Sequence, residues 1–254
     1  MNVLILGAGQ VGSALATLIK HKYPVTVMDR EARHVEGEWN FDVLHVCYPY
    51  SEWFVNNTCF YIDKFKPKLM LIESTVKPKT TWKLHNYYPD QPLCHSPVRG
   101  CHSSLLWGLE TYTKFIGPCT VKAGLMAERY YKSLGLKTYV AKGPTETECA
   151  KLMNLSYYAA QIALFQEFER KKEEYNLEYG DVLRFFETTT EESRGEVPRP
   201  IFKGECIGGT CVMPGLNMLF NPTKLAEWIN HSNLLRREEL IAQKMVPFLK
   251  GETV

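Results

Sequence analysis

The chain has 254 residues, of which 45% are hydrophobic and 23% charged, so it can bury a sizeable core. A net charge of +2 without a dense basic block argues against a nucleic-acid-binding surface, and no apolar run is long enough to cross a membrane. Met1 leads directly into an apolar run, so we expect no signal peptide and a cytoplasmic protein whose eight cysteines are thiols.

One short cluster resembles a metal site, namely Cys94-His95 followed by Cys101-His102. These four side chains could hold zinc in a loop, but their spacing matches no standard zinc site. We therefore expect no metal and interpret the cluster as part of a packed or functional loop.

The most informative pattern lies at the start of the chain. Val3–Leu6 is an apolar run of strand length, and it ends at Gly7-Ala8-Gly9-Gln10-Val11-Gly12. A helical pattern follows, then a second apolar run, Val25–Met28, which Asp29 ends. Strand, glycine turn, helix, strand and acid in this order form the dinucleotide-binding fingerprint in its required context. The residues expected to contact the dinucleotide are Gly7, Gly9, Gln10, Val11, Gly12, Asp29 and Arg30.

Each part of the fingerprint has a mechanical reason. Gly7 allows a tight turn, Gly9 lets the backbone approach a pyrophosphate, and Gly12 lets the helix pack closely on the strand. The helix N-terminus then offers N–H groups to the phosphates. Asp29 can accept hydrogen bonds from a ribose diol, which favours NAD, although Arg30 could bind a 2′-phosphate, so NADP is not excluded. The alternative is a glycine turn in an unrelated unit, or a degenerate site.

Strand-like and helix-like segments alternate after Asp29, which predicts a doubly wound, mostly parallel Rossmann-type sheet in residues 1–143. The expected strands are 43–46, 69–72, 93–95, 113–116 and 137–140, and the expected helices are 51–65, a helix from about 79, and 120–134. Ligands bind at the carboxyl ends of such strands. This rule places Tyr48, Pro49, Ser74 and Thr75 near the cofactor, unless the hydroxyl residues serve only to cap the following helix.

Residues 144–254 form a smaller, all-helical domain in this interpretation. Thr145–Glu148 reads as a capping box that opens a helix to about residue 175. This helix is apolar around most of its circumference, which predicts burial, and Lys151 on its crowded face needs a partner or a function unless it reaches water. Residues 181–189 are expected to be helical, 194–215 irregular, and 222–254 one or two helices. Cys211 follows a Gly-Gly pair and is approachable, although most cysteines are inert.

Several motifs together resemble the UDP-glucose/GDP-mannose (nucleotide-sugar) dehydrogenases. The motifs occur in the same order as in that family: Gly7–Gly12, Asp29, Glu73–Thr81, Ser96-Pro97, Glu148–Leu152 and Ile207–Cys211. The last is similar to the Gly-Ile-Gly-Gly-His-Cys signature of the branch that oxidises UDP-N-acetylated sugars. The resemblance implies an NAD-binding Rossmann domain and a helical domain through which family members pair as homodimers.

The resemblance also implies a reaction, the oxidation of a primary alcohol (CH–OH) to a carboxylate with NAD. By this comparison Cys211 is a nucleophile that forms a thiohemiacetal and then a thioester, Lys151 is the base or oxyanion-stabilising group, and Thr75 orients a water. Asn154 is a further catalytic candidate. A nucleotide-sugar substrate is expected to contact His95, Pro97, Arg99, His102, Gly208 and Gly209.

The sequence departs from the family at three polar positions. Val98 replaces the Glu that follows Ser-Pro, Leu155 replaces an Asn, and Gly215 replaces an Asp. The chain is also shorter than the family, so it resembles a compact form without the C-terminal nucleotide-sugar-binding domain. Two alternatives therefore remain: a two-electron β-hydroxyacid-type NAD(P) dehydrogenase that uses Lys151, or a non-catalytic NAD-binding protein.

Overall fold

The computed structural model describes residues 1–29, 40–100, 104–208 and 211–249. The chain divides into two compact units, residues 1–151 and residues 152–254. The division falls inside the long helix α6 (Pro144–Tyr175), whose first eight residues belong to the first unit. The domain boundary predicted at residue 143 lies immediately before this helix begins.

The first unit is built on a seven-stranded sheet in the order β2-β1-β3-β4-β5-β6-β7. Neighbouring strands are parallel except for the antiparallel pair β5 and β6, so the predicted mostly parallel Rossmann-type sheet is confirmed. The strands are β1 (Val3–Leu6), β2 (Val25–Met28), β3 (Val43–Val46), β4 (Leu69–Ile72), β5 (Leu93–His95), β6 (Lys114–Pro118) and β7 (Thr138–Val140).

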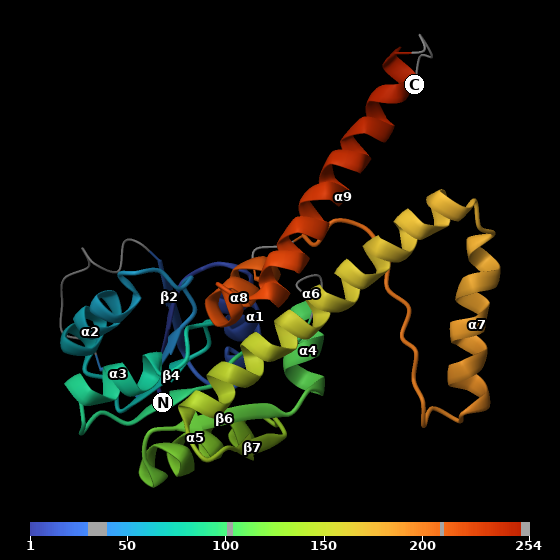
Figure 1. Ribbon diagram of the computed structural model, residues 1–254. Coiled ribbons are helices and arrows are strands. Elements are labelled where there is room, and N and C mark those ends of the chain that lie inside the picture. The colour runs from blue at the N-terminus through green and yellow to red at the C-terminus, as the bar shows by residue number, and fades with distance from the viewer. Residues whose placement is uncertain (30–39, 101–103, 209–210, 250–254) are drawn as a thin grey trace. The chain divides into compact units, whose positions relative to one another are not determined.

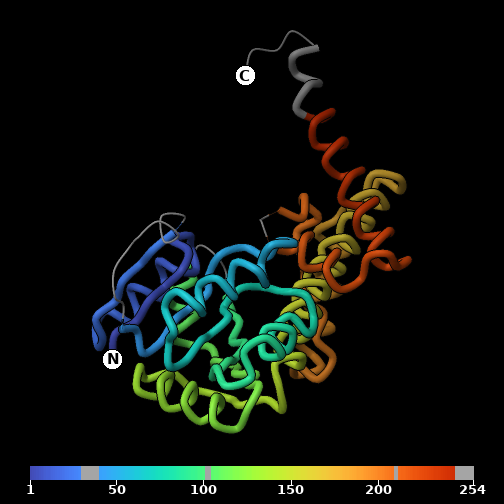
Figure 2. Tube along the Cα trace, turned by 90° about the vertical axis from the view of Figure 1, so that its left-hand side faces the viewer, coloured from blue at the N-terminus to red at the C-terminus, as the bar shows by residue number. Residues whose placement is uncertain are grey.

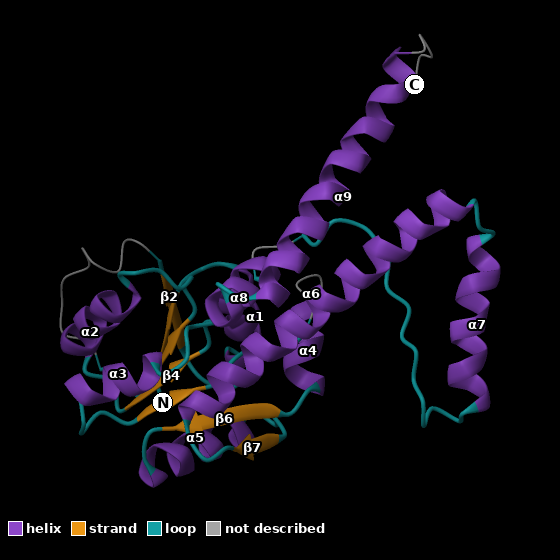
Figure 3. Ribbon diagram, in the orientation of Figure 1, coloured by secondary structure: helices purple, strands orange, loops and turns teal. Residues whose placement is uncertain are grey.

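Helices cover both faces of this sheet (Figures 1 and 3). One core lies between the sheet and helices α2 (Phe54–Phe65) and α3 (Thr80–Tyr87). The other lies between the sheet and helices α1 (Gln10–Ile19), α4 (Leu105–Thr111) and α5 (Val121–Ser133). Alternate residues of the central strands enter opposite cores, which explains why these strands are continuous apolar runs rather than alternating ones.

The second unit contains the rest of α6 with α7 (Tyr179–Glu192), α8 (Val212–Phe220) and α9 (Lys224–Leu249). Helices α6 and α9 lie side by side in both views (Figures 1 and 2). The small core between them includes Ala159, Ile162, Ala163, Ile207, Leu216, Ala226 and Ile229. Helix α7 contacts α6 through Phe186, which packs on Phe165 and Phe168.

Two local expectations differ from the structure. Helix α4 was not predicted, because it is seven residues long and contains Gly108. A side chain at residue 108 would lie 2.8 Å from the Arg99 carbonyl oxygen, so glycine lets the helix approach that loop. The expected all-round burial of α6 is wrong for the single chain, since Met153, Tyr157 and Leu164 are exposed.

In the described part of the chain, no helix has the length and apolar character that a membrane span requires.

Candidate functional site

The glycine turn lies at the topological switch point of the sheet. From β1 the chain passes to β2 on one side and then to β3 on the other, so the carboxyl ends of β1 and β3 face a crevice. Gly7 has φ +108°, and a Cβ there would be 3.0 Å from both the carbonyl carbon of Cys47 and the amide nitrogen of Tyr48. Only glycine fits this position without strain.

The N-terminus of α1 is open toward that crevice. Its N-cap residue, Gly9, makes no side-chain cap, and a Cβ at Gly9 would meet no described atom within 4 Å. A Cβ at Gly12 would lie 1.9 Å from the Gly7 carbonyl oxygen, so the helix can start this close to β1 only with glycine. Gln10 and Val11 form the first turn. Uncapped N–H groups beside open space are suited to phosphate.

The acid predicted to bind ribose lies beside this turn. The Ala8 amide donates a hydrogen bond of 3.3 Å to Asp29 Oδ2, and Asp29 is exposed at the end of β2. The residues of the glycine turn and Asp29 therefore fit a dinucleotide. Arg30 lies outside the described residues.

The ends of β3 and β4 are joined through Ser74. Its hydroxyl donates to the Tyr48 carbonyl oxygen at 2.6 Å and contacts the Val46 carbonyl oxygen at 3.1 Å. Ser74 therefore links strand ends and does not cap α3, which was the alternative interpretation. Thr75 is half-buried and Pro49 is exposed at the same edge.

Helix α3 is capped by a distant carboxylate, that of Glu148 in the first turns of α6. The amide of Lys79 donates to Glu148 Oε2 at 2.6 Å, and the amide and hydroxyl of Thr81 donate to Oε1 at 2.8 and 2.6 Å. Burial raises the pKa of Glu148 against the opposing effect of these donors. The carboxylate thus serves α3 rather than a capping box on Thr145.

His95, the last residue of β5, forms hydrogen bonds to Ser74, which follows β4, and to Thr147 of α6. Its Nε2 donates to the Ser74 carbonyl oxygen at 3.1 Å, and its Nδ1 lies 2.8 Å from the Thr147 hydroxyl. The ring is fully buried, and burial lowers its pKa to about 3, so the imidazole is neutral at pH 7. With both nitrogens engaged, His95 offers none to a substrate in this structure.

Lys151 lies one turn after Glu148. Its ammonium donates to the Val98 carbonyl oxygen at 2.9 Å, and Val98 itself is buried. Nearby, the Arg99 guanidinium is exposed and lies 5.2 and 5.4 Å from the ring centres of Tyr112 and Phe115. The other substrate candidates of this loop are Pro97, which is buried, and His102, which lies outside the described residues.

A buried charge network missed by sequence reasoning lies next to this edge of the sheet. The Glu73 carboxylate accepts hydrogen bonds from His45 Nδ1 at 2.8 Å, from the Tyr131 hydroxyl at 2.7 Å and from the Lys114 ammonium. Lys114 also donates to the Ser96 carbonyl oxygen at 2.7 Å. Burial opposes the charge of Glu73, but Lys114 and His45 outweigh it and lower its pKa to about 2. The sequence did carry a signal for this network, because the ionisable residues His45 and Lys114 lie in otherwise apolar strands.

Cys211, in the second unit, is the N-cap residue of α8 and is half-buried. The segment that leads to it borders a cavity of about 460 Å³. Residues lining this cavity include Tyr158, Ile162, Phe202, Cys206, Ile207 and Gly208. Gly208 is exposed, whereas Gly209 lies outside the described residues.

Two of the departures from the family pattern pack against each other. A Cβ at Gly215 would lie 2.6 Å from Leu155 Cδ1, and both residues are buried. The neighbouring Asn154 is exposed. Position 215 therefore cannot carry a side chain unless Leu155 moves or becomes smaller.

The candidate zinc cluster is only partly described. Cys94 and His95 are buried, whereas Cys101 and His102 lie outside the described residues. Within the described ranges, no three His, Cys, Asp or Glu side chains gather in a way that could hold a metal ion.

The mostly parallel sheet with its glycine turn at the switch point is a Rossmann-type, dinucleotide-binding fold, and a helical unit follows it in the chain. No family model matches the chain. UDP-N-acetyl-D-mannosamine dehydrogenase of Methanococcus vannielii is 28% identical over 193 residues, which are 75% of this chain and 42% of that protein. UDP-D-ManNAc dehydrogenase from Pyrococcus horikoshii has a TM-score of 0.81 at 17% identity, over 99% of this chain and 72% of that chain.

The chain is thus similar in sequence to UDP-N-acetyl-D-mannosamine dehydrogenases, in agreement with the resemblance of its motifs to the nucleotide-sugar dehydrogenases. It spans about two fifths of the length of the curated relatives it matches. The fold is shared more widely. Mycobacterium tuberculosis 3-hydroxyisobutyrate dehydrogenase has a TM-score of 0.65 at 16% identity, over 93% of this chain and 92% of that chain.

Proposed function

We propose that the chain is an NAD-dependent dehydrogenase that oxidises the primary alcohol of a nucleotide sugar to a carboxylate. The observation that carries the proposal is the uncapped N-terminus of α1 beside Gly9 and Asp29, in a chain related to UDP-N-acetyl-D-mannosamine dehydrogenases. The glycine turn and Gln10–Val11 would hold the pyrophosphate, and Asp29 the ribose diol, as NAD rather than NADP requires. When bound, NAD supplies the acceptor for hydride.

Lys151 is the proposed base or oxyanion-stabilising group. Its ammonium donates a hydrogen bond to the carbonyl oxygen of Val98, which directly follows Ser96-Pro97. This bond fixes the position of the ammonium, from which it is proposed to contact an alcohol oxygen. The hydroxyl of Thr75 and the amide of Asn154 are proposed to assist by orienting water and substrate.

Cys211 is the proposed nucleophile. Its sulfur would add to the carbonyl carbon of the aldehyde while the carbonyl oxygen takes a proton, which gives a thiohemiacetal. A second oxidation then gives a thioester, and water cleaves its C–S bond to release the carboxylate and the thiol. As N-cap residue of α8, Cys211 lies where the helix dipole favours negative charge. The cavity lined by Tyr158, Phe202 and Gly208 is proposed to receive part of the substrate.

A two-electron oxidation that stops at the aldehyde or ketone is the second candidate, and one observation favours it. Leu155 and Gly215 form an apolar contact at two positions where the family carries polar residues, and Val98 is buried at the third. Cleavage of a thioester needs a group that activates water, whereas a single oxidation, with NAD as hydride acceptor and Lys151 as base, does not.

We also propose a homodimer, because α6 exposes Met153, Tyr157 and Leu164 on a helix that would otherwise bury them. Light scattering at micromolar concentration tests this part of the proposal, and a monomeric mass would count against it.

The test of the reaction is NADH formation with a panel of UDP- and GDP-sugars, counting NADH per sugar consumed, for the wild type and Cys211→Ala. Two NADH per sugar, lost in the variant, is the expected result. One NADH per sugar, or activity that survives the substitution, would support the two-electron reaction. NAD binding without any turnover would show that the chain is a cofactor-binding protein and overturn both.

A further inference from the structure

Two buried side-chain amides, on helices α6 and α9, hold the main chain at Glu205 and Ile207, which precede Cys211 in the sequence. The Ile207 amide donates to Asn233 Oδ1 at 2.7 Å, and Asn233 Nδ2 lies 3.4 Å from the Ile207 carbonyl oxygen. Gln166 Nε2 donates to the Glu205 carbonyl oxygen at 2.7 Å. Gln166 is fully buried, Asn233 is 7% exposed and Ile207 is buried, so the main-chain groups of Ile207 depend on the Asn233 amide for their hydrogen bonds.

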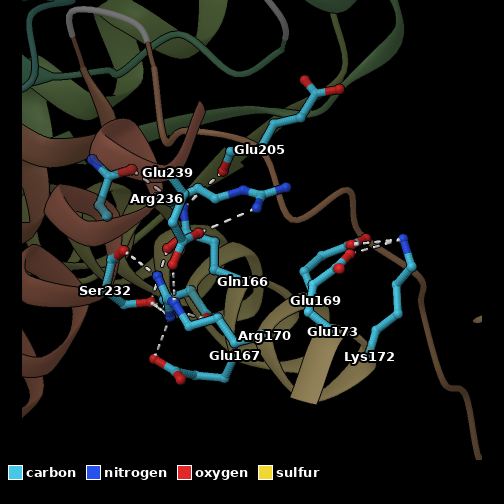
Figure 4. A network of polar contacts seen from close by, with 12 residues as sticks. Gln166, Glu167, Glu169, Arg170, Lys172, Glu173, Glu205, Ser232, Arg236 and Glu239 are labelled. Carbon is cyan, nitrogen blue, oxygen red and sulfur yellow. Dashed lines mark hydrogen bonds and ion pairs between the residues drawn. The ribbon is translucent and has the colours of Figure 1, made fainter. Parts of the chain in front are cut away.

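These amides are themselves fixed by a polar network (Figure 4). Gln166 Nε2 also contacts Asn233 Oδ1 at 3.3 Å, and the Ser232 hydroxyl donates to Gln166 Oε1 at 3.0 Å. The Arg170 guanidinium donates to the Ser232 carbonyl oxygen at 2.9 Å and to Glu239 at 2.7 Å. Because each amide has partners on both its oxygen and its nitrogen, neither can rotate without breaking several hydrogen bonds.

We propose that Gln166 and Asn233 are positioning residues for Cys211. They fix the main chain at Glu205 and Ile207, six and four residues before the cysteine, while burial of Leu216 in the helical core fixes α8 on the other side. In sequence, Cys211 thus lies between two anchored points, the main chain at Ile207 and the buried Leu216 of α8. The inference rests on the proposed function only for its effect on turnover, because the effect on the thiol is measurable without a substrate.

Loss of either amide should free the main chain at Glu205 or Ile207. It should leave the dinucleotide cradle, which is the glycine turn Gly7–Gly12 with Asp29, unchanged. In Asn233→Ala the amide and carbonyl of Ile207 lose their partners, so they would seek water and draw the segment outward. The cradle at Gly7–Gly12 and Asp29 belongs to the first unit, so the affinity for NAD should be unaffected.

The test compares Asn233→Ala and Gln166→Ala with the wild type in the full chain. The alkylation rate of Cys211 by iodoacetamide is followed by peptide mass spectrometry, beside NAD affinity and the kcat with a nucleotide sugar. We expect Cys211 to be alkylated about tenfold faster and kcat to fall about 10- to 100-fold, with NAD affinity within about twofold of wild type. Asn233→Asp keeps the acceptor for the Ile207 amide and should show a smaller change of the same sign.

Gln91→Ala is the matched control. The Gln91 side-chain amide also donates to main-chain carbonyl oxygens, those of Pro67 at 2.9 Å and Pro92 at 3.2 Å, and it belongs to the first unit. Its partners are thus neither residues 205–207 nor α8, so the substitution should leave the alkylation rate of Cys211 near the wild-type value. An unchanged or slower rate in both alanine variants, or an equal increase in the control, would overturn the proposal. Absence of turnover in the wild type would refute the proposed reaction while the alkylation rates still decide the role of the two amides.

Discussion

The turn from Gly7 to Gly12 is shaped by main-chain atoms of the turn and of the adjacent strand end, whereas the approach to Cys211 is held by side chains 39 and 26 residues away in sequence. The first arrangement needs glycine at fixed positions and almost nothing else. The second needs two amides on different helices, each supported by further groups. A cofactor site of the first kind is visible in a local pattern, whereas a reactive segment of the second kind depends on tertiary packing.

The largest effect is expected at the glycine turn Gly7–Gly12. Two glycine substitutions there should distinguish an effect on the free energy of unfolding from an effect on the affinity for NAD. Gly12→Ala places a Cβ 1.9 Å from the Gly7 carbonyl oxygen, so it should lower the free energy of unfolding by about 3 kcal/mol and abolish NAD binding. Gly9→Ala meets no described atom within 4 Å, so it should leave the stability within about 0.5 kcal/mol while weakening NAD binding about 100-fold. Urea unfolding and fluorescence titration with NADH measure the two quantities. Equal loss of stability in both variants would contradict this account.

The buried network around Glu73 gives the next largest effect. Lys114→Met leaves the Glu73 carboxylate without its ammonium partner, which should cost about 3 to 5 kcal/mol of stability. The double variant Lys114→Met/Glu73→Gln removes the uncompensated charge and should recover part of that loss, as a double-mutant cycle by urea unfolding would show. Strict additivity of the two substitutions would show that the pair is not coupled.

The same network predicts how stability depends on pH. Because the pKa of Glu73 is lowered from 4.5 to about 2 in the folded chain, its contribution is present above pH 4.5 and is lost as the pH falls toward 2. His95, whose pKa is lowered from 6.5 to about 3, adds a loss of stability that begins below pH 6.5, since the unfolded chain takes up the proton first. Urea midpoints between pH 7 and pH 3 should therefore fall steadily, and a midpoint that stays constant over this range would count against both groups.

The smallest effect concerns the apolar contact beside α8. Gly215→Asp alone should cost about 2 kcal/mol, because its Cβ would lie 2.6 Å from Leu155 Cδ1. Adding Leu155→Asn should recover about 1 kcal/mol of this cost, since the shorter side chain gives way. Thermal unfolding of the single and double variants measures this coupling. If the double variant is no more stable than the sum of the single effects predicts, the two positions do not constrain each other.

Much of the sheet could be predicted because parallel strands buried on both faces appear as short apolar runs, as in Leu69–Ile72. The glycine turn was predictable for the same local reason. The role of Glu148 was not predicted because a capping-box pattern is local, whereas the Thr81 amide that it binds lies 67 residues earlier in the chain. The charged run Arg236–Glu239 has the pattern of a solvated helix face, yet the half-buried Glu239 accepts a hydrogen bond from Arg170 of α6. In both cases the sequence shows the charge but not the distant residue to which it bonds.

The tautomer of His95 has a consequence for any activity measurement. Its ring donates from Nε2 to a carbonyl oxygen and is buried, and burial lowers its pKa to about 3, so it does not take up a second proton near neutrality. An inflection between pH 5 and pH 8 in a rate profile would therefore report another group. In an NMR titration, the ring signals of His95 would remain constant across that interval while those of exposed histidines move.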